Sequence, residues 1–354
     1  MKNFRIFLNT ILFTVVLCLS VVNSTWAITD GVPDWTDNAT NAGYLYPNTV
    51  SISGFRLDTD TGKWVSFRRC SGSYLTSNSN TLIILTAGHC SSLYSQSLAN
   101  GSIVTVGVSF DALIEKLPGS TSLWGSSQYI LGGTPITYNR FGPTYNASNI
   151  QWDYGLIVFP SDPSDPLDPS DKGKAKTDGG TVIDLNTITP VTLPPLGFLE
   201  TLQHNVDMLT NVGYGTGSLF NEKGHASPPD TPTDTNYDTF GVRYIADQSL
   251  FIGFQGQDQN LVLSSQNPAR DNTGTCGGDS GGPQFVTSND QELIVAITSA
   301  GDAVCRSTNI AARLDIPDAQ NFINQCAYNT NTIDDASTCS LGCTEVNSKG
   351  ICPK

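Results

Sequence analysis

The amino-acid sequence predicts an all-β fold, and three of its features lead to this prediction. Valine, isoleucine and leucine occur in short runs, which glycine, proline, asparagine, aspartate and serine interrupt at close intervals. Long helical periodicity is missing after residue 27, except over Pro317–Cys326. Short strands between frequent turn residues are typical of a β-sandwich or a β-barrel. The 327 residues that follow position 27 are long for one domain and suit two packed halves.

Residues 1–27 are predicted to be a secretory signal peptide. Lys2 and Arg5 give a positive start, and a mostly apolar stretch runs from Ile6 to Val22. The segment then ends at Ala27, in a context suited to signal peptidase. An uncleaved membrane anchor is the alternative, because seventeen residues are near the lower limit for a span. Cleavage is the preferred interpretation, and it predicts a secreted protein, extracellular or periplasmic.

The net charge excludes two classes of partner. The whole chain carries −14, and the signal peptide contributes two positive charges and no negative one, so the remainder carries −16. A strongly acidic chain repels nucleic acid and anionic membranes. We therefore expect no nucleic-acid partner, and no membrane partner after signal cleavage.

Nine cysteines include one in the signal peptide, which leaves eight. An even number after a secretory leader predicts disulfides and an oxidising compartment. Cys326, Cys339, Cys343 and Cys352 crowd into the last 29 residues. Four cysteines allow three pairings, among which the sequence does not choose. A zinc site is the rival, but paired Cys-x-x-Cys knuckles are missing, so two disulfides are the better interpretation.

The segment 275–283 reads Thr-Cys-Gly-Gly-Asp-Ser-Gly-Gly-Pro. A serine between glycines on a tight turn is held out where its hydroxyl can attack a substrate. Small neighbours also let a carbonyl approach the backbone N–H groups of Gly278 and Ser280, which could hold an oxyanion. The same letters satisfy Gly-x-Ser-x-Gly, the nucleophile turn of α/β-hydrolases. The motif alone therefore leaves two folds open.

The three histidines decide between these folds. An α/β-hydrolase needs its histidine after the serine, whereas His89, His204 and His225 all precede Ser280. The order histidine, aspartate, serine remains. His89 lies in Leu-Thr-Ala-Gly-His-Cys, which follows the apolar run Leu82–Ile84, and Asp153 stands at the head of another apolar run in Trp-Asp-Tyr-Gly-Leu-Ile-Val-Phe.

These motifs make the chain resemble the trypsin- and chymotrypsin-like serine proteases. Thr-Ala-Gly-His-Cys and Gly-Asp-Ser-Gly-Gly-Pro are both long and specific, and they occur in the family's order. The resemblance covers nearly all of residues 28–326. It implies two six-stranded antiparallel β-barrels, the first over about 28–185 and the second over about 186–326, with a C-terminal helix. Residues 327–354 lie outside it and are expected to form a Cys-rich tail.

The chemistry that the resemblance implies is acyl transfer by a serine endopeptidase. His89 would act as general base, Asp153 would orient it, and Ser280 would be the nucleophile, with the oxyanion on the N–H groups of Gly278 and Ser280. Protein or peptide substrates are implied, with protein inhibitors as a further class of partner. No metal or organic cofactor is called for. The alternative is a catalytically silent homologue that binds partners through the same fold.

The resemblance also implies two disulfides. Cys70 pairs with Cys90, which staples the loop behind the catalytic histidine. Cys276 pairs with Cys305, which ties the nucleophile turn to the far wall of the specificity pocket.

Activation in this family uses a new amino terminus, whose ammonium pairs with the aspartate before the serine. Ile28 begins Ile-Thr-Asp-Gly, which resembles that terminus, and it follows Ala27 directly. Asp279 stands in the partner position. A buried carboxylate is costly unless an opposite charge meets it. We therefore expect signal peptidase itself to create the activating terminus; the alternative is cleavage elsewhere, followed by a second protease.

The specificity pocket is predicted to involve Gly274, Thr275, Ser299 and Gly301. Gly274 lies six residues before the nucleophile, where relatives that cut after Lys or Arg carry an aspartate. A pocket without that carboxylate should not stabilise a buried cation. The sequence thus predicts no strong Lys/Arg preference and a leaning to uncharged or apolar side chains. Asp302 would change this if its loop folded inward.

Overall fold

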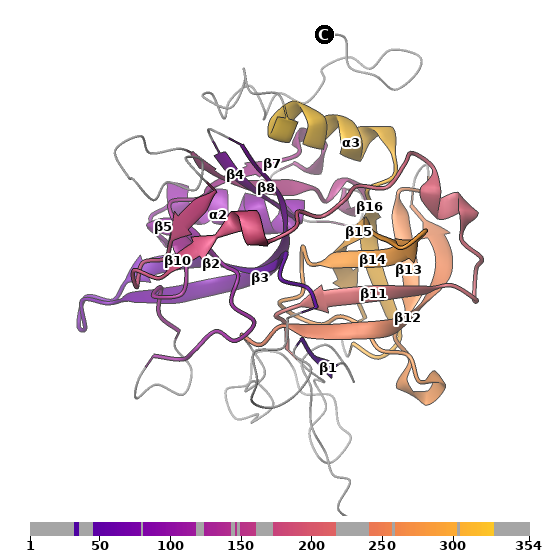
Figure 1. Cartoon of the computed structure of the whole chain (residues 1–354), viewed down its shortest axis with the longest axis horizontal. Coiled ribbons are helices and arrows are strands. Elements are labelled where there is room, and N and C mark those ends of the chain that lie inside the picture. Colours follow the sequence, from indigo (N-terminus) through magenta and orange to yellow (C-terminus); the bar gives the residue numbers. More distant parts are fainter. Residues whose placement is uncertain are drawn as a thin grey trace, which may run out of the picture.

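The computed structural model describes residues 32–34, 45–78, 81–117, 124–142, 146, 149–160, 173–216, 241–256, 259–302 and 305–328. Two seven-stranded antiparallel sheets form two halves side by side, the first mainly indigo to magenta and the second mainly pink to yellow in Figure 1. The predicted signal peptide, Ile28 and residues 329–354 lie outside the described part of the chain.

The first half is a curled sheet with strand order β6-β5-β2-β3-β4-β8-β7. Its strands are β2 (Thr49–Leu57), β3 (Trp64–Asn78), β4 (Thr81–Thr86), β5 (Thr105–Ser109), β6 (Ile130–Leu131), β7 (Thr134–Thr137) and β8 (Gly155–Pro160). It differs from a closed barrel because its edge strands β6 and β7 are not paired with each other in the described residues. The two strands are joined instead by Gly132 and Gly133, whose N–H groups both donate to the carbonyl of Val106. The two strands are therefore joined by a chain connection there and not by a ladder of hydrogen bonds.

The second half is a closed six-stranded antiparallel barrel. It consists of β11 (Met208–Gly213), β12 (Tyr244–Gln255), β13 (Leu261–Ser265), β14 (Pro283–Ser288), β15 (Gln291–Gly301) and β16 (Thr308–Arg313). Pairing of β12 with β13 closes the ring. The short strand β1 (Val32–Pro33) adds to β12, although the predicted boundary assigned residues from 28 onward to the first barrel. A separate ribbon pairs β9 (Lys174–Lys176) with β10 (Val182–Asp184).

Two helices complete the described structure's regular elements. The predicted C-terminal helix is confirmed as α3 (Pro317–Ile323), which starts with proline and continues as a π-helical turn over Asn324–Tyr328. Helix α2 (Gly88–Ala99) was not predicted, because its serine-rich sequence lacks an apolar stripe. Among the described residues no helix has the length and apolar character needed to cross a bilayer.

A shared hydrophobic core holds the two halves together. One buried cluster contains Leu85 and Leu156 of the first sheet, Ile294 and Ile297 of the second, and Phe322 of α3. In Figure 1 helix α3, drawn in yellow, lies above the junction of the two halves. The strand ends that carry the candidate site therefore meet at a packed interface.

A buried ion pair joins the N-terminal segment to both halves. Arg243 Nε donates to Asp34 Oδ2 at 2.5 Å, and both side chains are fully buried. Nη1 of the same guanidinium donates to the carbonyls of Thr49 and Phe110 and to the hydroxyl of Tyr214. One side chain thus connects the segment after β1, the first sheet and the loop that follows β11.

Asp34→Ala is expected to lower the free energy of unfolding by about 3–5 kcal/mol, because it leaves a buried guanidinium without its carboxylate. Urea unfolding followed by circular dichroism measures this loss. Arg140→Ala is the matched control, since it breaks a 2.7 Å pair with Asp318 whose side chains are 38% and 23% exposed. That change should cost at most about 1 kcal/mol. Equal losses in the two variants would contradict the role given to the buried pair.

Candidate active site

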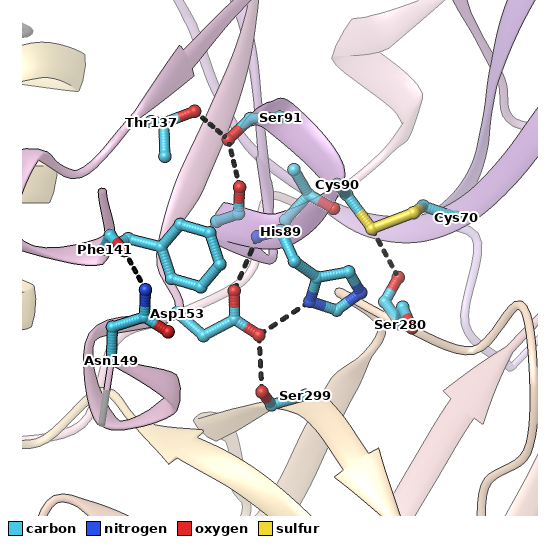
Figure 2. A network of polar contacts seen from close by, with 12 residues as sticks. Cys70, His89, Cys90, Ser91, Thr137, Phe141, Asn149, Asp153, Ser280 and Ser299 are labelled. Atoms are coloured by element: carbon cyan, nitrogen blue, oxygen red, sulfur yellow. Dashed lines mark hydrogen bonds and ion pairs between the residues drawn. A yellow bond between two sulfur atoms is a disulfide. The ribbon is translucent and has the colours of Figure 1, made fainter. Parts of the chain in front are cut away.

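His89 and Asp153 are held against each other by two contacts. His89 is the second residue of α2, and Asp153 lies between a 3₁₀ turn over Ile150–Trp152 and strand β8. Nδ1 of His89 lies 2.7 Å from Oδ2 of Asp153, and the backbone N–H of His89 donates to Oδ1 at 2.6 Å (Figure 2). Asp153 is fully buried. The carboxylate therefore fixes both the ring and the start of the helix.

The proton affinity of His89 reflects this environment. Burial lowers the pKa of the imidazole, while the charge of Asp153 and its hydrogen bond raise it. The second effect prevails, so the pKa of His89 lies above its ordinary value. A ring stabilised in this way can hold a proton that it takes from a neighbouring group.

Ser299, on β15, also contacts the carboxylate. Its hydroxyl donates a hydrogen bond to Oδ2 of Asp153, across 146 residues of sequence (Figure 2). The sequence predicted Ser299 at the wall of the specificity pocket and gave no sign of this contact. The hydroxyl belongs to the His89–Asp153 pair, and a role for Ser299 in the pocket stays a prediction.

The segment around Ser280 forms a tight turn that depends on glycine. Gly278 and Gly281 have φ angles of +97° and +81°, which side chains rarely adopt. A Cβ on Gly281 would also lie 2.1 Å from Oγ1 of Thr86. The N–H of Asp279 donates to the carbonyl of Cys276 at 3.1 Å and closes the turn.

Ser71 of β3 fastens this turn to the first half. Its N–H donates to the carbonyl of Ser280 at 2.8 Å, and its hydroxyl donates to the carbonyl of Gly278 at 3.0 Å. The same hydroxyl accepts the N–H of Tyr214 at 3.0 Å. The sequence analysis missed Ser71. The sequence offers only its position next to Cys70, and its complete burial is visible only in the structure.

His89, Asp153 and Ser280, the residues of the predicted triad, lie in one region in Figure 2. In Figure 2 the His89 ring lies between Asp153 and Ser280. The sulfur of Cys90, next to His89, lies 3.7 Å from the carbonyl oxygen of Ser280. The structure thus places α2, the start of β8 and the turn before β14 in one region.

Both implied disulfides are present near these residues. Cys70–Cys90 joins β3 to α2, and Cys276–Cys305 joins the start of the nucleophile turn to the loop after β15. The sulfurs of Cys70 and Cys90 also cluster with a ring nitrogen of His89 in a way that could suggest a metal. Because the two sulfurs are bonded to each other, they do not offer thiolates as ligands.

Asp279 is a buried carboxylate directly before the serine. Its oxygens accept the N–H groups of Gly215 at 2.7 Å and Cys276 at 2.8 Å. Burial outweighs these two hydrogen bonds and raises its pKa to about 7. No cation within the described residues pairs with it, and its predicted partner Ile28 lies outside them.

The residues predicted for the specificity pocket lie on two neighbouring segments. Thr275 donates its hydroxyl to Oδ1 of Asn309 at 2.9 Å, and Gly301 pairs with Asn309 between β15 and β16. Asp302 does not present a free carboxylate, because the N–H groups of Ser307 and Thr308 donate to it at 2.7 and 2.8 Å. The negative charge of Asp302 is therefore met by backbone N–H groups of its own loop.

No protein-family model matches this chain, and no curated protein matches it either. The chymotrypsin-like arrangement of a closed barrel and a curled half-barrel is seen in the strand topology itself.

Proposed function

We propose that the protein is a secreted serine endopeptidase that cleaves peptide bonds through an acyl-enzyme. The observation that carries this proposal is the His89–Asp153 pair, 2.7 Å apart, next to the glycine-bounded turn of Ser280. Two disulfides beside the site support an oxidising compartment, and therefore secretion.

His89 takes the proton of Ser280 as the hydroxyl attacks the peptide carbonyl, and then gives it to the leaving amine. Asp153 keeps Nδ1 protonated, so that Nε2 is the basic nitrogen, and stabilises the imidazolium; Ser299 and the N–H of His89 hold the carboxylate in place. Water then enters the same site and hydrolyses the ester with His89 as the base.

The oxyanion of the tetrahedral intermediate is assigned to the N–H groups of Gly278 and Ser280. Neither group donates to an acceptor in the described part of the protein, whereas the flanking N–H groups of Asp279 and Gly281 do. Ser71 fixes the peptide planes on either side through the carbonyls of Gly278 and Ser280. Hydrogen-bond donors that are already in position before the reaction can stabilise the oxyanion in the transition state, and this accounts for a large part of the catalysis in such sites.

A fluorophosphonate reagent tests the proposal directly. Incubated with the secreted protein, it should add one phosphonyl group, and peptide mapping by mass spectrometry should place it on Ser280. Heat-denatured protein is the control and should remain unlabelled, because the serine is activated only in the folded site. Folded protein with both disulfides intact but no adduct would argue for a silent homologue that acts as a binding protein.

A further inference from the structure

The side chain of Gln266 connects the two segments of the predicted specificity pocket. Gln266 directly follows β13 and is fully buried. Its Oε1 accepts the N–H of Thr275 at 2.9 Å, and its Nε2 donates to Oδ1 of Asp302 at 3.2 Å. The carboxamide thus bridges two segments: Thr275, just before the Ser280 turn, and Asp302, in the loop after β15.

The surroundings of Gly274 and Gly301 show how much of the predicted specificity pocket the Gln266 side chain occupies. A Cβ on Gly274 would lie 2.1 Å from Oε1 and 2.2 Å from Cβ of Gln266, distances that real side chains do not adopt. A Cβ on Gly301 would lie 3.7 Å from Nε2, at ordinary contact distance. Gly274 is therefore small because Gln266 packs on it, and the room between the two glycines holds the carboxamide.

The carboxamide is fixed at both ends. The backbone N–H of Gln266 also donates to the carbonyl of Ser307 at 3.0 Å, in the loop that the Cys276–Cys305 disulfide anchors. The Asp302 carboxylate, which accepts from Nε2, is held by backbone N–H groups of the same loop. Moving a buried amide away from both partners would leave polar groups unsatisfied, which costs about 1–3 kcal/mol for each group. A substrate side chain will not displace it readily.

We propose that Gln266 fills the primary specificity site, so that the enzyme cleaves after residues with small side chains, such as glycine, alanine and serine. The inference rests on the proposed function and narrows its substrate class. Large apolar side chains are excluded by volume, and Lys and Arg are excluded by volume and by the engagement of Asp302 within its loop.

Peptides that differ in one residue, alanine, leucine, phenylalanine or arginine before the cleaved bond, test the inference. For the wild-type enzyme kcat/KM should be at least about 100-fold higher with alanine than with the three large residues. Gln266→Ala should raise the leucine-to-alanine and phenylalanine-to-alanine ratios at least about 10-fold. Gln266→Met is the matched control, because it keeps the volume without the amide and should keep the preference for alanine.

Fluorophosphonate labelling of each variant separates the possible failures. No labelling of the wild-type enzyme would refute the proposed function itself. Normal labelling together with efficient wild-type cleavage after leucine, phenylalanine or arginine would overturn the inference and leave the function standing. Equal ratios in Gln266→Ala and Gln266→Met would overturn it as well. If Gln266→Ala does not fold, Gln266→Ser frees a similar volume, and the wild-type profile still decides.

Discussion

Ser280→Ala is expected to remove nearly all peptidase activity, lowering kcat by a factor of about 10⁴ to 10⁶. Without the hydroxyl no acyl-enzyme forms, and what remains is binding and the oxyanion site. His89→Ala and Asp153→Asn should also remove most activity, because the former loses the base and the latter loses the charge that orients it. All three variants should keep the fold, as judged by circular dichroism. Activity is measured by release of a chromophore from a peptide substrate.

The three substitutions should be grossly non-additive, because the residues act as one unit. A triple variant is expected to be about as slow as the slowest single variant, and a multiplicative fall would argue against the assignment. Ser102→Ala is the control, since Ser102 is exposed and should leave the rate unchanged.

One extra residue before Ile28 is expected to abolish activity without unfolding the protein. In the proposed mature form the amino group of Ile28 supplies an opposite charge to the buried Asp279, which keeps its carboxylate ionised. An extension removes that ammonium, so the turn that carries Gly278 and Ser280 loses its organising charge. The same residue added after Lys354 is the control and should leave activity intact. Terminal sequencing shows which form is present, and a fully active extended protein, or an active form that begins elsewhere, would refute the proposal.

The pH dependence of stability should differ between the two forms. In the extended form the pKa of Asp279 is raised to about 7, so the folded state holds a proton that the unfolded chain releases near pH 4. The contribution of Asp279 to the stability of this form is fully present below about pH 4 and is lost as the pH rises through about 7, by up to about 4 kcal/mol. Pairing with Ile28 keeps the carboxylate ionised and removes this loss. Urea unfolding of both forms between pH 4 and pH 8 isolates the difference.

The sequence was sufficient for the fold class, and its long motifs supplied candidates for the site. Short strands with turn residues give a β-fold without any tertiary information, and the motifs name His89 and Ser280 directly. Helix α2 escaped prediction because half of its buried residues are serines, so its buried face lacks a continuous apolar stripe. Periodicity detects a helix only when its buried side is hydrophobic.

The supporting contacts could not be predicted, because they join residues far apart in the chain. Ser71 bonds to Gly278 across 207 residues, and Ser299 bonds to Asp153 across 146. Gln266 is a further case, since it lies in the polar segment Ser-Ser-Gln-Asn-Pro, yet the fold buries it completely. Local polarity does not reveal which polar side chain will be enclosed.

The anchoring of residues 32–34 bears on self-digestion, a hazard for any endopeptidase at high concentration. The proposed peptidase would bind its substrate as an extended strand, and such a strand pairs through free backbone groups. Val32 and Pro33 already pair with β12, and Asp34 is held by the buried guanidinium of Arg243. Another molecule of the enzyme would have to strip this segment from the barrel before cutting it. In the proposed peptidase, the Asp34–Arg243 pair would therefore protect the amino-terminal segment from self-cleavage and preserve the connection on which the proposed activation depends.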